Sequence, residues 1–598
     1  MLAVIANWIY VIITTYIIGF AVLEGIASIS CMHVSKGQKR FVYSFKYNES
    51  YLVAGILVVN VYAELFSLIS RVSLAANLVL ILACALLYYE YREAMNERLI
   101  NGIGRVISTG SAWLYLAIFL LMAYGTSHGL MHYDTDLYHA QAIRWIEEFG
   151  TIKGLGNLHL RLGYNSASFA LSALYSGSFW GKQMHAMAGY FALLLAWLCA
   201  DLKSIERRGH VILSDFVRVT AIYYLFTIFD EMVSPASDYF MATMVFYIVI
   251  QWLDLNSSRE RAFLPYALLS ICAVYVTTIK LSAAPLLLLS LHPIIRISKK
   301  EKKKGLTPIM LSVLFCLIIA APYFVRNVIQ TGWLIYPFTG IDLFNFSWKI
   351  PFATALSDAN EITVYGRGFT DPSKISEPLR DWFPEWYTGL SKVNKGMLIL
   401  DALSIPVYIG CAGYYIVRRI FRKKKKAFPG DETISKIFHL SRRRTVSLSD
   451  FLFIEGVTYI CLVYFLLTSP LIRYGCVYLW LPTVIMMGRF VILFDNRFDE
   501  NIKRYIYRIA VALFAVFMMF KFGVLIRDDY PRFKPSYLVA QQPYNSYVLK
   551  EKQINGNVFY YPEEGDRTGY ELFPSTPNPD GFNMGGDKIT DGFLPNFE

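Results

Sequence analysis

The acidic residues that could do chemistry in this chain stand at the ends of long apolar segments. An apolar run ends near Tyr124, and the polar segment after it contains Asp134 and Asp136, two residues apart. A third carboxylate, Asp238, opens a later apolar run. Carboxylates next to a membrane-length segment are costly unless they are used, so we expect a functional site that includes all three. Capping of the helices that follow is the competing explanation.

Isolated cations occupy similar positions. Lys280 separates two apolar runs, Arg326 follows the end of another, and Arg473 lies in a short turn between two more. For any one of them, extension of the side chain to the membrane interface explains the position equally well. As a set, they favour a site that holds an anion such as phosphate.

The elements that must position these residues are membrane-spanning helices. The chain has 598 residues, of which 55% are hydrophobic and 17% charged, and this composition excludes a single soluble domain. The sequence predicts an all-α integral membrane protein with about 14 transmembrane helices. The predicted spans are Leu2–Ile29, Tyr51–Ser70, Leu74–Tyr91, Ile107–Tyr124, Met184–Ala200, Val217–Phe229, Tyr239–Leu253, Pro265–Thr278, Ala283–Ile297, Thr307–Phe324, Met397–Val417, Ser447–Thr468, Val477–Leu493 and Ile509–Val524.

The distribution of basic residues over the joints predicts the orientation. If the joint after the first span is cytoplasmic, the cytoplasmic joints hold more than half of the 57 Lys and Arg residues. The short outer turns hold only Arg71, Lys280 and Arg473. This bias places both termini on the extracytoplasmic side. The same orientation puts three long polar segments outside, where we expect the function: Gly125–Gln183, Asn327–Gly396 and Arg527–Glu598.

The formal net charge of +12 does not indicate a nucleic-acid partner, because the basic residues lie in these joints. The runs Lys302–Lys304 and Lys423–Lys426 are interpreted as topology anchors rather than lipid-binding sites. No disulfide or thiolate–metal framework is expected, because all eight cysteines lie in or at the ends of apolar runs. They are Cys31, Cys84, Cys199, Cys272, Cys316, Cys411, Cys461 and Cys476.

The outer segments contain elements of their own. Leu137–Phe149 carries Ala140, Ile143 and Ile146 at three-residue spacing, which predicts an amphipathic helix on the membrane surface. The C-terminal segment is rich in Gly, Pro, Asn and Tyr and shows little helical periodicity. We interpret it as a small extracytoplasmic cap.

These motifs resemble the first outer loop of GT-C fold glycosyltransferases, multispanning enzymes that take a sugar from a polyprenyl-phosphate carrier. The loop of those enzymes is similar to the Asp-x-x-x-Tyr from Asp134 to Tyr138 and to the basic Arg161 after a Gly-containing turn. The likeness continues at Asp238 and Lys280. One departure is that the family usually places the acidic motif after its first span, whereas here about three predicted helices precede the span before the motif.

The resemblance extends beyond the first loop. The segment Pro322–Pro337 is similar to a helix end and loop entrance of the same enzymes. The whole pattern, including the ending Gly586–Phe593, also resembles a bacterial family of uncharacterised multispanning envelope proteins.

The resemblance implies transfer of a sugar to an acceptor on the extracytoplasmic face, and it implies roles for the charged residues. Asp134 would accept the proton of the acceptor, Asp136 would orient the acceptor or a metal, and Asp238 would complete the acidic wall. The donor phosphate would be held by Lys280, Arg326 and Arg473. The acceptor side of the loop would contain Tyr138, His139, Arg161 and Asn165.

A metal ion is an open alternative at the acidic motif. Asp134 and Asp136 have the spacing of metal-dependent sugar transferases, and their oxygen ligands suit Mg²⁺ or Mn²⁺. The three histidines of this region, His132, His139 and His159, match no zinc spacing, so hydrogen bonding is the simpler explanation for them.

Other functions compete with the transferase. A polysaccharide flippase or another transporter would also be polytopic, but its charged residues should lie in the middle of the spans, where this sequence has few. A Wzy-like repeat-unit polymerase relies on arginines and fits the acidic motif less well. A purely structural envelope protein is the third alternative.

The predicted organisation has three parts. Residues 1–106 form N-terminal transmembrane helices, residues 107–526 form a GT-C-like core with outer loops 125–183 and 327–396, and residues 527–598 form the tail. The expected partners are a polyprenyl-phosphate-linked sugar donor, a glycan or lipid-linked acceptor, and membrane lipid. The expected location is the bacterial plasma membrane, with the active site on the extracytoplasmic side.

Overall fold

The chain is mostly helical in a computed structural model, which describes residues 1–32, 49–181, 183–301, 305–423, 446–495 and 499–596. In these ranges, 11 helices are long and apolar enough to cross a membrane, and two shorter apolar helices accompany them. The prediction of a helical, multi-pass membrane protein is confirmed at this level.

All 14 predicted spans fall on helical segments. Eleven of these segments reach spanning length, counting the continuous segments Met187–Arg208 and Leu281–Lys299, and the other three are shorter. They are α4 (Ala112–Ser127), α10 (Leu213–Thr227) and α12 (Phe263–Ile279). At 1.5 Å per residue, helices of this size are about 23–26 Å long, which is less than the roughly 30 Å of a hydrocarbon core. The sequence pattern located them, but their length distinguishes them from the other 11.

The remaining α-helices range from four to 35 residues in length. They are α1 Leu2–Met32, α2 Glu49–Ile69, α3 Leu74–Ser108, α5 Ala140–Glu148, α6 Leu155–Leu158, α7 Ala167–Leu174, α8 Met187–Cys199, α9 Ser204–Arg208, α11 Ser237–Ser257, α13 Leu291–Glu301, α14 Leu306–Thr331, α15 Phe352–Gly366, α16 Leu379–Gly389, α17 Lys392–Lys423, α19 Leu448–Thr468, α20 Ile472–Asp495 and α21 Glu500–Asp529. Three irregular helices matter for the site: the π-helix η1 Thr135–His139 and the 3₁₀-helices η2 Leu160–Tyr164 and η6 Leu281–Ser290.

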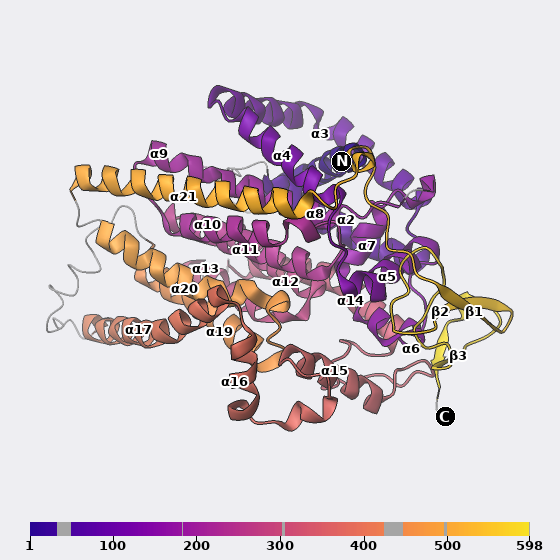
Figure 1. Cartoon of the computed structure of the whole chain (residues 1–598). Helices are drawn as coiled ribbons and strands as arrows, with labels where there is room; N and C mark the ends of the chain where they lie inside the picture. The colour runs from indigo at the N-terminus through magenta and orange to yellow at the C-terminus, as the bar shows by residue number, and fades with distance from the viewer. Residues whose placement is uncertain (33–48, 182, 302–304, 424–445, 496–498, 597–598) are drawn as a thin grey trace.

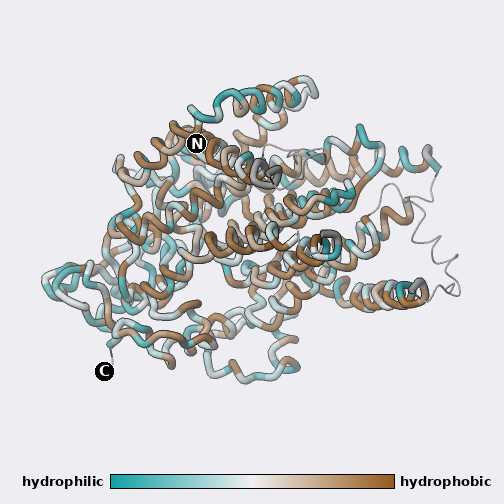
Figure 2. The backbone as a smooth tube through the Cα atoms, turned by 180° about the vertical axis from the view of Figure 1, so that it is seen from behind, coloured by the Kyte–Doolittle hydropathy of each residue, from teal (hydrophilic) through white to brown (hydrophobic). Residues whose placement is uncertain are grey.

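The long helices run side by side, and the polar elements gather at one end of the bundle (Figure 1). Helices α5, α6 and α7 and the strands of the tail lie together at that end, opposite the start of α21. Hydrophobic residues follow the bundle helices, and hydrophilic residues concentrate towards the tips (Figure 2). This distribution is typical of a bundle that spans an apolar layer.

Helix α11 forms the centre of the bundle. Nearly all its side chains are buried, including Phe240 and Trp252, and it packs against α8, α10, α12 and α20. A helix that is apolar on every side needs neighbours on every side. In contrast, the most apolar stretch of α21 is not buried within the molecule, as expected of a helix that faces lipid.

Two glycines allow α1 and α2 to pack closely. A Cβ at Gly19 would lie 1.8 Å from the backbone oxygen of Tyr51, and a Cβ at Gly55 would lie 1.8 Å from that of Thr15. Small residues at such a contact let two membrane helices approach to backbone distance. The first two helices therefore form a tight pair.

The C-terminal tail is ordered and packs on the first outer loop. It contains two antiparallel pairs, β1 Leu549–Ile554 with β2 Asn557–Pro562, and β3 Phe582–Met584 with β4 Phe593–Pro595. Arg144 of α5 donates to the backbone oxygen of Glu571 at 2.8 Å. The tail thus covers the loop, in agreement with the interpretation as a cap.

Helix α5 confirms the predicted helix but not its predicted environment. Seven of its nine residues are buried, including Trp145 and Ile146. Trp145 packs edge-on against Phe573 and Phe593 of the tail, while the helix contacts α7 on another side. The prediction of a helix on the membrane surface is therefore wrong, because the apolar face expected to meet lipid is buried within the molecule, with Ile143 0% and Ile146 2% exposed.

Several sequence-based expectations lie outside the described residues. The lysines of the run Lys302–Lys304 and most of the run Lys423–Lys426 belong to this group, as does the joint 33–48. The side chain of Cys31 is also outside the description. The other cysteines are free thiols, namely Cys84, Cys199, Cys272, Cys316, Cys411, Cys461 and Cys476.

We predict that Glu147 anchors the tail. Its carboxylate accepts from Tyr570 at 2.6 Å and pairs with His185 at 3.0 Å, and the side chains of Glu147 and His185 are both 1% exposed. Glu147→Ala would leave both partners buried without it, at a cost of about 3–5 kcal/mol. Limited proteolysis of the purified protein should show faster cleavage in the tail. The exposed pair Lys550–Glu563 gives the control: Lys550→Ala should leave the cleavage rate unchanged. Equal cleavage of the Glu147 variant and the parent would contradict the anchoring role.

Candidate active site

A cavity of about 310 Å³ lies where the ends of several bundle helices meet the outer loops. Its lining includes the predicted site residues Asp134, Asp238 and Lys280. Residues from two other outer segments complete it, among them Tyr336 and Thr363. The cavity therefore collects side chains that are far apart in the sequence.

Four charged side chains form one cluster, of which Asp134, Asp238 and Lys280 line this cavity and Arg473 lines a second cavity of about 290 Å³. Nη2 of Arg473 lies 2.6 Å from Oδ2 of Asp134, and its Nε lies 3.2 Å from Oδ2 of Asp238. Lys280 pairs with the other oxygen of Asp238. Two carboxylates thus balance two cations. Asp238 is almost fully buried, whereas about a fifth of each of the other three side chains is exposed and open to a ligand.

Each member of the cluster stands at a helix boundary. Asp134 directly precedes η1, and Asp238 lies in the first turn of α11. Lys280 joins α12 to η6, and Arg473 lies in the first turn of α20. A carboxylate at a helix N-terminus interacts favourably with the helix dipole, and this interaction adds to the ion pairs of Asp238.

Helix capping does not account for the two carboxylates. The side chain of Asp134 makes no capping hydrogen bond to η1. The carboxylate of Asp238 is used by Lys280 and Arg473. The functional interpretation of their positions is therefore favoured over the capping alternative.

Aromatic side chains surround the charges. Nζ of Lys280 lies 3.8 Å from the ring centre of Tyr474, and Cζ of Arg473 lies 5.2 Å from the same ring. Tyr138 and Tyr164 meet edge to face on another wall, with ring centres 5.6 Å apart. A cavity with aromatic walls and a few charged groups is well suited to bind a small polar ligand.

A second polar network forms the rim of the cavity. Arg161 pairs with Glu361 at 2.7 Å, and Asp358 accepts from Tyr164 at 3.0 Å and from Tyr336 at 2.9 Å. Burial raises the pKa of the Asp358 carboxyl, although the two hydrogen bonds from tyrosines oppose this effect. The network joins the first outer loop to the second one through α15.

Burial also changes the titration of groups near the cluster. It lowers the pKa of Lys280, and the charge of Asp238 opposes this shift. It lowers the pKa of His132, and nearby Arg473 adds to that effect. A neutral imidazole has one ring nitrogen free to accept a hydrogen bond, which suits the contact of His132 with Arg473.

The structure places Asp136 away from the cluster. Its Oδ2 accepts from Asn545 and from Tyr547 of the tail, both at 2.7 Å, and the residue is 2% exposed. It does not line the cavity. On a helix, residues two positions apart project to nearly opposite sides, so Asp134 faces the cavity while Asp136 faces the tail.

Arg326 is also separate from the other cations. It is 1% exposed, and its Nε donates to Oδ1 of Asn165 at 2.9 Å. Its Nη1 donates to the hydroxyl of Ser67, and Glu64 lies near enough to interact with its charge. The side chain thus connects α14 to α2 and to the loop residue Asn165, and it does not line the cavity. Tyr323, one turn earlier on α14, lines it instead.

Some of the remaining predicted acceptor residues line the cavity, and others do not. Tyr138 and Arg161 line the cavity, whereas His139 lies beneath it and is 1% exposed. Burial lowers the pKa of His139 well below its ordinary value, so this side chain is neutral near pH 7. Hydrogen bonding and packing account for it, as the sequence indicated.

The described residues contain no group of three or more His, Cys, Asp or Glu side chains that could hold a metal ion. The two metal candidates, Asp134 and Asp136, bind Arg473 and the tail respectively. These carboxylates therefore do not fit the predicted Mg²⁺ or Mn²⁺ site.

Several residues of the site were missed by sequence reasoning. Tyr164, Tyr336, Asp358 and Glu361 lie in outer segments that were identified as functional, and Tyr474 directly follows Arg473 in a short outer turn. Their chemistry was visible, because aromatic and acidic residues punctuate both loops. Nothing in their spacing indicates which of them face the same cavity.

Comparisons with known proteins place the chain in a family but not near a protein of known function. A family model described as a domain of unknown function, DUF8201, matches residues 1–480. The match includes Asp134, Asp238, Lys280 and Arg473 and stops before the tail. No curated protein and no solved structure matches the chain.

We predict different losses of stability for Arg326 and Arg161, two of the three arginines that sequence analysis assigned to the site. Arg326→Ala removes a buried cation and leaves Glu64 and Asn165 without it, which should lower the free energy of unfolding by about 3–5 kcal/mol. Arg161→Ala breaks a partly exposed pair and should cost about 1 kcal/mol or less. Thermal unfolding of the purified variants in detergent measures the difference. Equal unfolding temperatures for the two variants would be incompatible with a structural role for Arg326.

Proposed function

We propose that this chain, which belongs to the DUF8201 family, is a GT-C-type glycosyltransferase of the cell envelope. It moves a sugar from a polyprenyl-phosphate carrier to a glycan or lipid-linked acceptor. We place the reaction on the extracytoplasmic face of the bacterial plasma membrane, because the charge bias of the joints orients the cavity to that side.

The observation that carries the proposal is the ion cluster of Asp134, Asp238, Lys280 and Arg473, three members of which line the cavity while Arg473 pairs with two of them. Two cations at a membrane boundary match the phosphate of a lipid-linked donor, and a partly exposed carboxylate beside them matches a base. Tyrosine walls offer apolar faces and hydroxyl groups to a sugar ring. A site for a purely apolar ligand would need none of these charges.

The proposed reaction is a displacement at the anomeric carbon of the donor sugar, in which one bond forms and one breaks. The acceptor hydroxyl attacks the anomeric carbon, a new carbon–oxygen bond forms, and the bond from that carbon to the phosphate oxygen breaks with both electrons moving to the phosphate. The acceptor proton passes to Asp134. Lys280 and Arg473 stabilise the negative charge that increases on the departing phosphate.

Asp238 acts through the cations. Its two oxygens hold Lys280 and Arg473 on one side of the cavity. Because this arrangement exists before any ligand binds, the cations need little reorganisation when charge develops on the phosphate. In this role, Asp238 is a positioning residue rather than the base.

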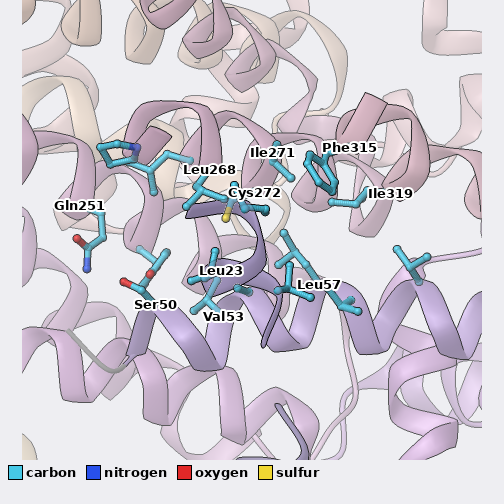
Figure 3. Close-up of a pocket in the computed structure, with 18 of the residues that line it drawn as sticks. Leu23, Ser50, Val53, Leu57, Gln251, Leu268, Ile271, Cys272, Phe315 and Ile319 are labelled. Atoms are coloured by element: carbon cyan, nitrogen blue, oxygen red, sulfur yellow. The ribbon is translucent and has the colours of Figure 1, made fainter. Parts of the chain in front are cut away.

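The lipid chain of the donor has a second cavity available to it. An apolar cavity of about 300 Å³ is lined by side chains of α1, α2, α11, α12 and α14, including Cys272 and Ile319 (Figure 3). The same helices α12 and α14 carry Ile279 and Tyr323 at the candidate site. Cys272 and Ile279 are seven residues apart, which is about 10 Å along a helix. An isoprenoid chain is long enough to extend from the phosphate into this space.

No metal takes part in the proposed step. The residues predicted to bind Mg²⁺ or Mn²⁺ point apart, and Lys280 and Arg473 supply positive charge at the position of the phosphate. The transport alternative is favoured by a different observation, the two carboxyl groups of Asp401 and Glu455, which are buried within the spans. The two activities are separated by whether the bond between sugar and phosphate breaks.

Asp134→Asn should slow sugar transfer by about 10²–10⁴-fold and leave donor binding largely intact, because it removes the base and keeps the shape of the side chain. The assay is release of polyprenyl phosphate from a panel of polyprenyl-phosphate sugars by purified protein in detergent. Lys280→Ala is the matched variant, and it should weaken donor binding instead. Normal turnover of a folded Asp134→Asn variant would remove Asp134 as the base. Movement of an intact lipid-linked glycan without bond cleavage would support the transporter.

The pH dependence of the reaction should report Lys280. Only the charged ammonium group binds phosphate, and burial lowers the pKa of Lys280, so activity should fall as the pH rises through this lowered pKa. Lys280→Arg keeps the charge at all accessible pH values and should move the alkaline loss of activity to higher pH. Profiles of kcat/KM against pH for the parent and this variant make the comparison. Superimposable alkaline limbs would show that another group titrates.

A further inference from the structure

Two carboxyl groups lie within membrane-spanning helices, away from the candidate site. Asp401 of α17 is 1% exposed, and Glu455 of α19 is fully buried. They lie nine and seven residues from the starts of their helices, which corresponds to about 13 Å and about 10 Å along them. Both positions are well inside a hydrocarbon core of roughly 30 Å, where an ionisable side chain is costly and usually functional.

The polar groups around this pair have partners. Helices α17, α19 and α20 pack against one another, and Figure 1 shows them on one flank of the bundle. Trp480 donates to Oδ1 of Asn394 at 2.9 Å. The hydroxyls of Ser404 and Tyr459 are 2.5 Å apart. The seam between the three helices is therefore a polar contact in which hydrogen bonds are generally satisfied.

Asp401 is satisfied on one oxygen only. Its Oδ1 accepts from the backbone N–H of Thr483 at 2.9 Å and from the Thr483 hydroxyl at 2.5 Å. Its Oδ2 is buried and has no hydrogen-bond partner. The orientation of the carboxyl group is thus fixed from α20, and one oxygen stays available.

Glu455 lacks more hydrogen-bond partners than Asp401 does. Neither of its carboxyl oxygens has a well-aligned hydrogen-bond partner, and the Tyr459 hydroxyl is the group within reach to donate to it. Asp401 is close enough to act on Glu455 electrostatically, and so are the hydroxyl groups of Tyr459 and Tyr408. Oδ2 of Asp401 and the Glu455 carboxyl therefore form an incomplete site of acceptor oxygens.

No cation of the described chain neutralises the pair. Neither carboxyl takes part in an ion pair with a described Lys, Arg or His residue. The charged residue further along α20, Arg489, donates instead to the backbone oxygen of Val446 at 2.6 Å. Two uncompensated negative charges at close range in an apolar medium cannot both persist, so the pair must bind at least one positive charge.

We propose that Asp401 and Glu455 form an intramembrane binding site for one monovalent cation, a proton or a sodium ion. The cation lies between Oδ2 of Asp401 and the carboxyl group of Glu455, with hydroxyl oxygens nearby. Helix α20 connects this site to the outer cavity, because it carries both Thr483 and, ten residues earlier, Arg473. Binding of the cation does not require the proposed sugar transfer.

Labelling with a hydrophobic carbodiimide tests the site directly, because this reagent reacts with protonated carboxyl groups in apolar surroundings. The full chain in detergent is treated at neutral pH in sodium-free buffer, and mass spectrometry identifies the modified residues. We expect modification of Glu455. Slowing of about tenfold or more by sodium chloride, but not by potassium chloride of equal ionic strength, would identify sodium as the cation. Equal labelling in the two salts would identify a proton.

Two comparisons make the result specific. Glu64 is an equally buried carboxyl in α2, but it accepts from Asn60 at 3.0 Å and has Arg326 nearby, so it should be labelled more slowly than Glu455. Asp401→Asn keeps the oxygen that accepts from Thr483 and places an N–H donor near Glu455. This change should reduce Glu455 labelling about tenfold, as a shift of one pH unit in its titration would. Absence of Glu455 labelling in the folded parent protein, or unchanged labelling in Asp401→Asn, would overturn the proposal.

Discussion

The outer end of this protein depends on one side chain, Arg473, which pairs with carboxylates from two distant segments. Asp134 follows α4, Asp238 opens α11, and both meet the guanidinium group at the start of α20. Removal of Arg473 would leave a buried carboxylate without its ion-pair partner and would destabilise the protein by about 3–5 kcal/mol. The ion cluster therefore fixes the relative positions of helix ends that hydrophobic packing alone would leave free to shift.

The same interaction determines what the cavity can bind. Asp238 attracts both Lys280 and Arg473, and this attraction offsets the repulsion between the two cations. The site can therefore hold them close together. An incoming phosphate can exchange its water shell for preoriented N–H donors, each worth about 1.5–3 kcal/mol when the acceptor is charged.

The tail adds a second constraint, since it binds Asp136 and covers α5, and this keeps the first outer loop in one arrangement.

Hydropathy predicted the helices well, because a segment that must satisfy its backbone in lipid has few alternatives. The sequence also indicated which segments carry the site, and Asp134, Asp238, Lys280 and Arg473 meet there. It could not assign Asp136, because spacing of two residues brings side chains together in an extended segment and separates them on a helix. The docking of the tail on α5 and the buried position of Arg326 depend on tertiary contacts across hundreds of residues, which periodicity does not encode.

A structure of the purified protein with bound polyprenyl phosphate, determined by electron cryomicroscopy, tests most directly whether the cavity binds a lipid-linked donor. The proposed function predicts phosphate density within hydrogen-bond distance of Lys280 and Arg473, with the lipid chain extending between α12 and α14. Density for polyprenyl phosphate at another position, with the cavity empty at a saturating concentration of the lipid, would contradict the proposed function.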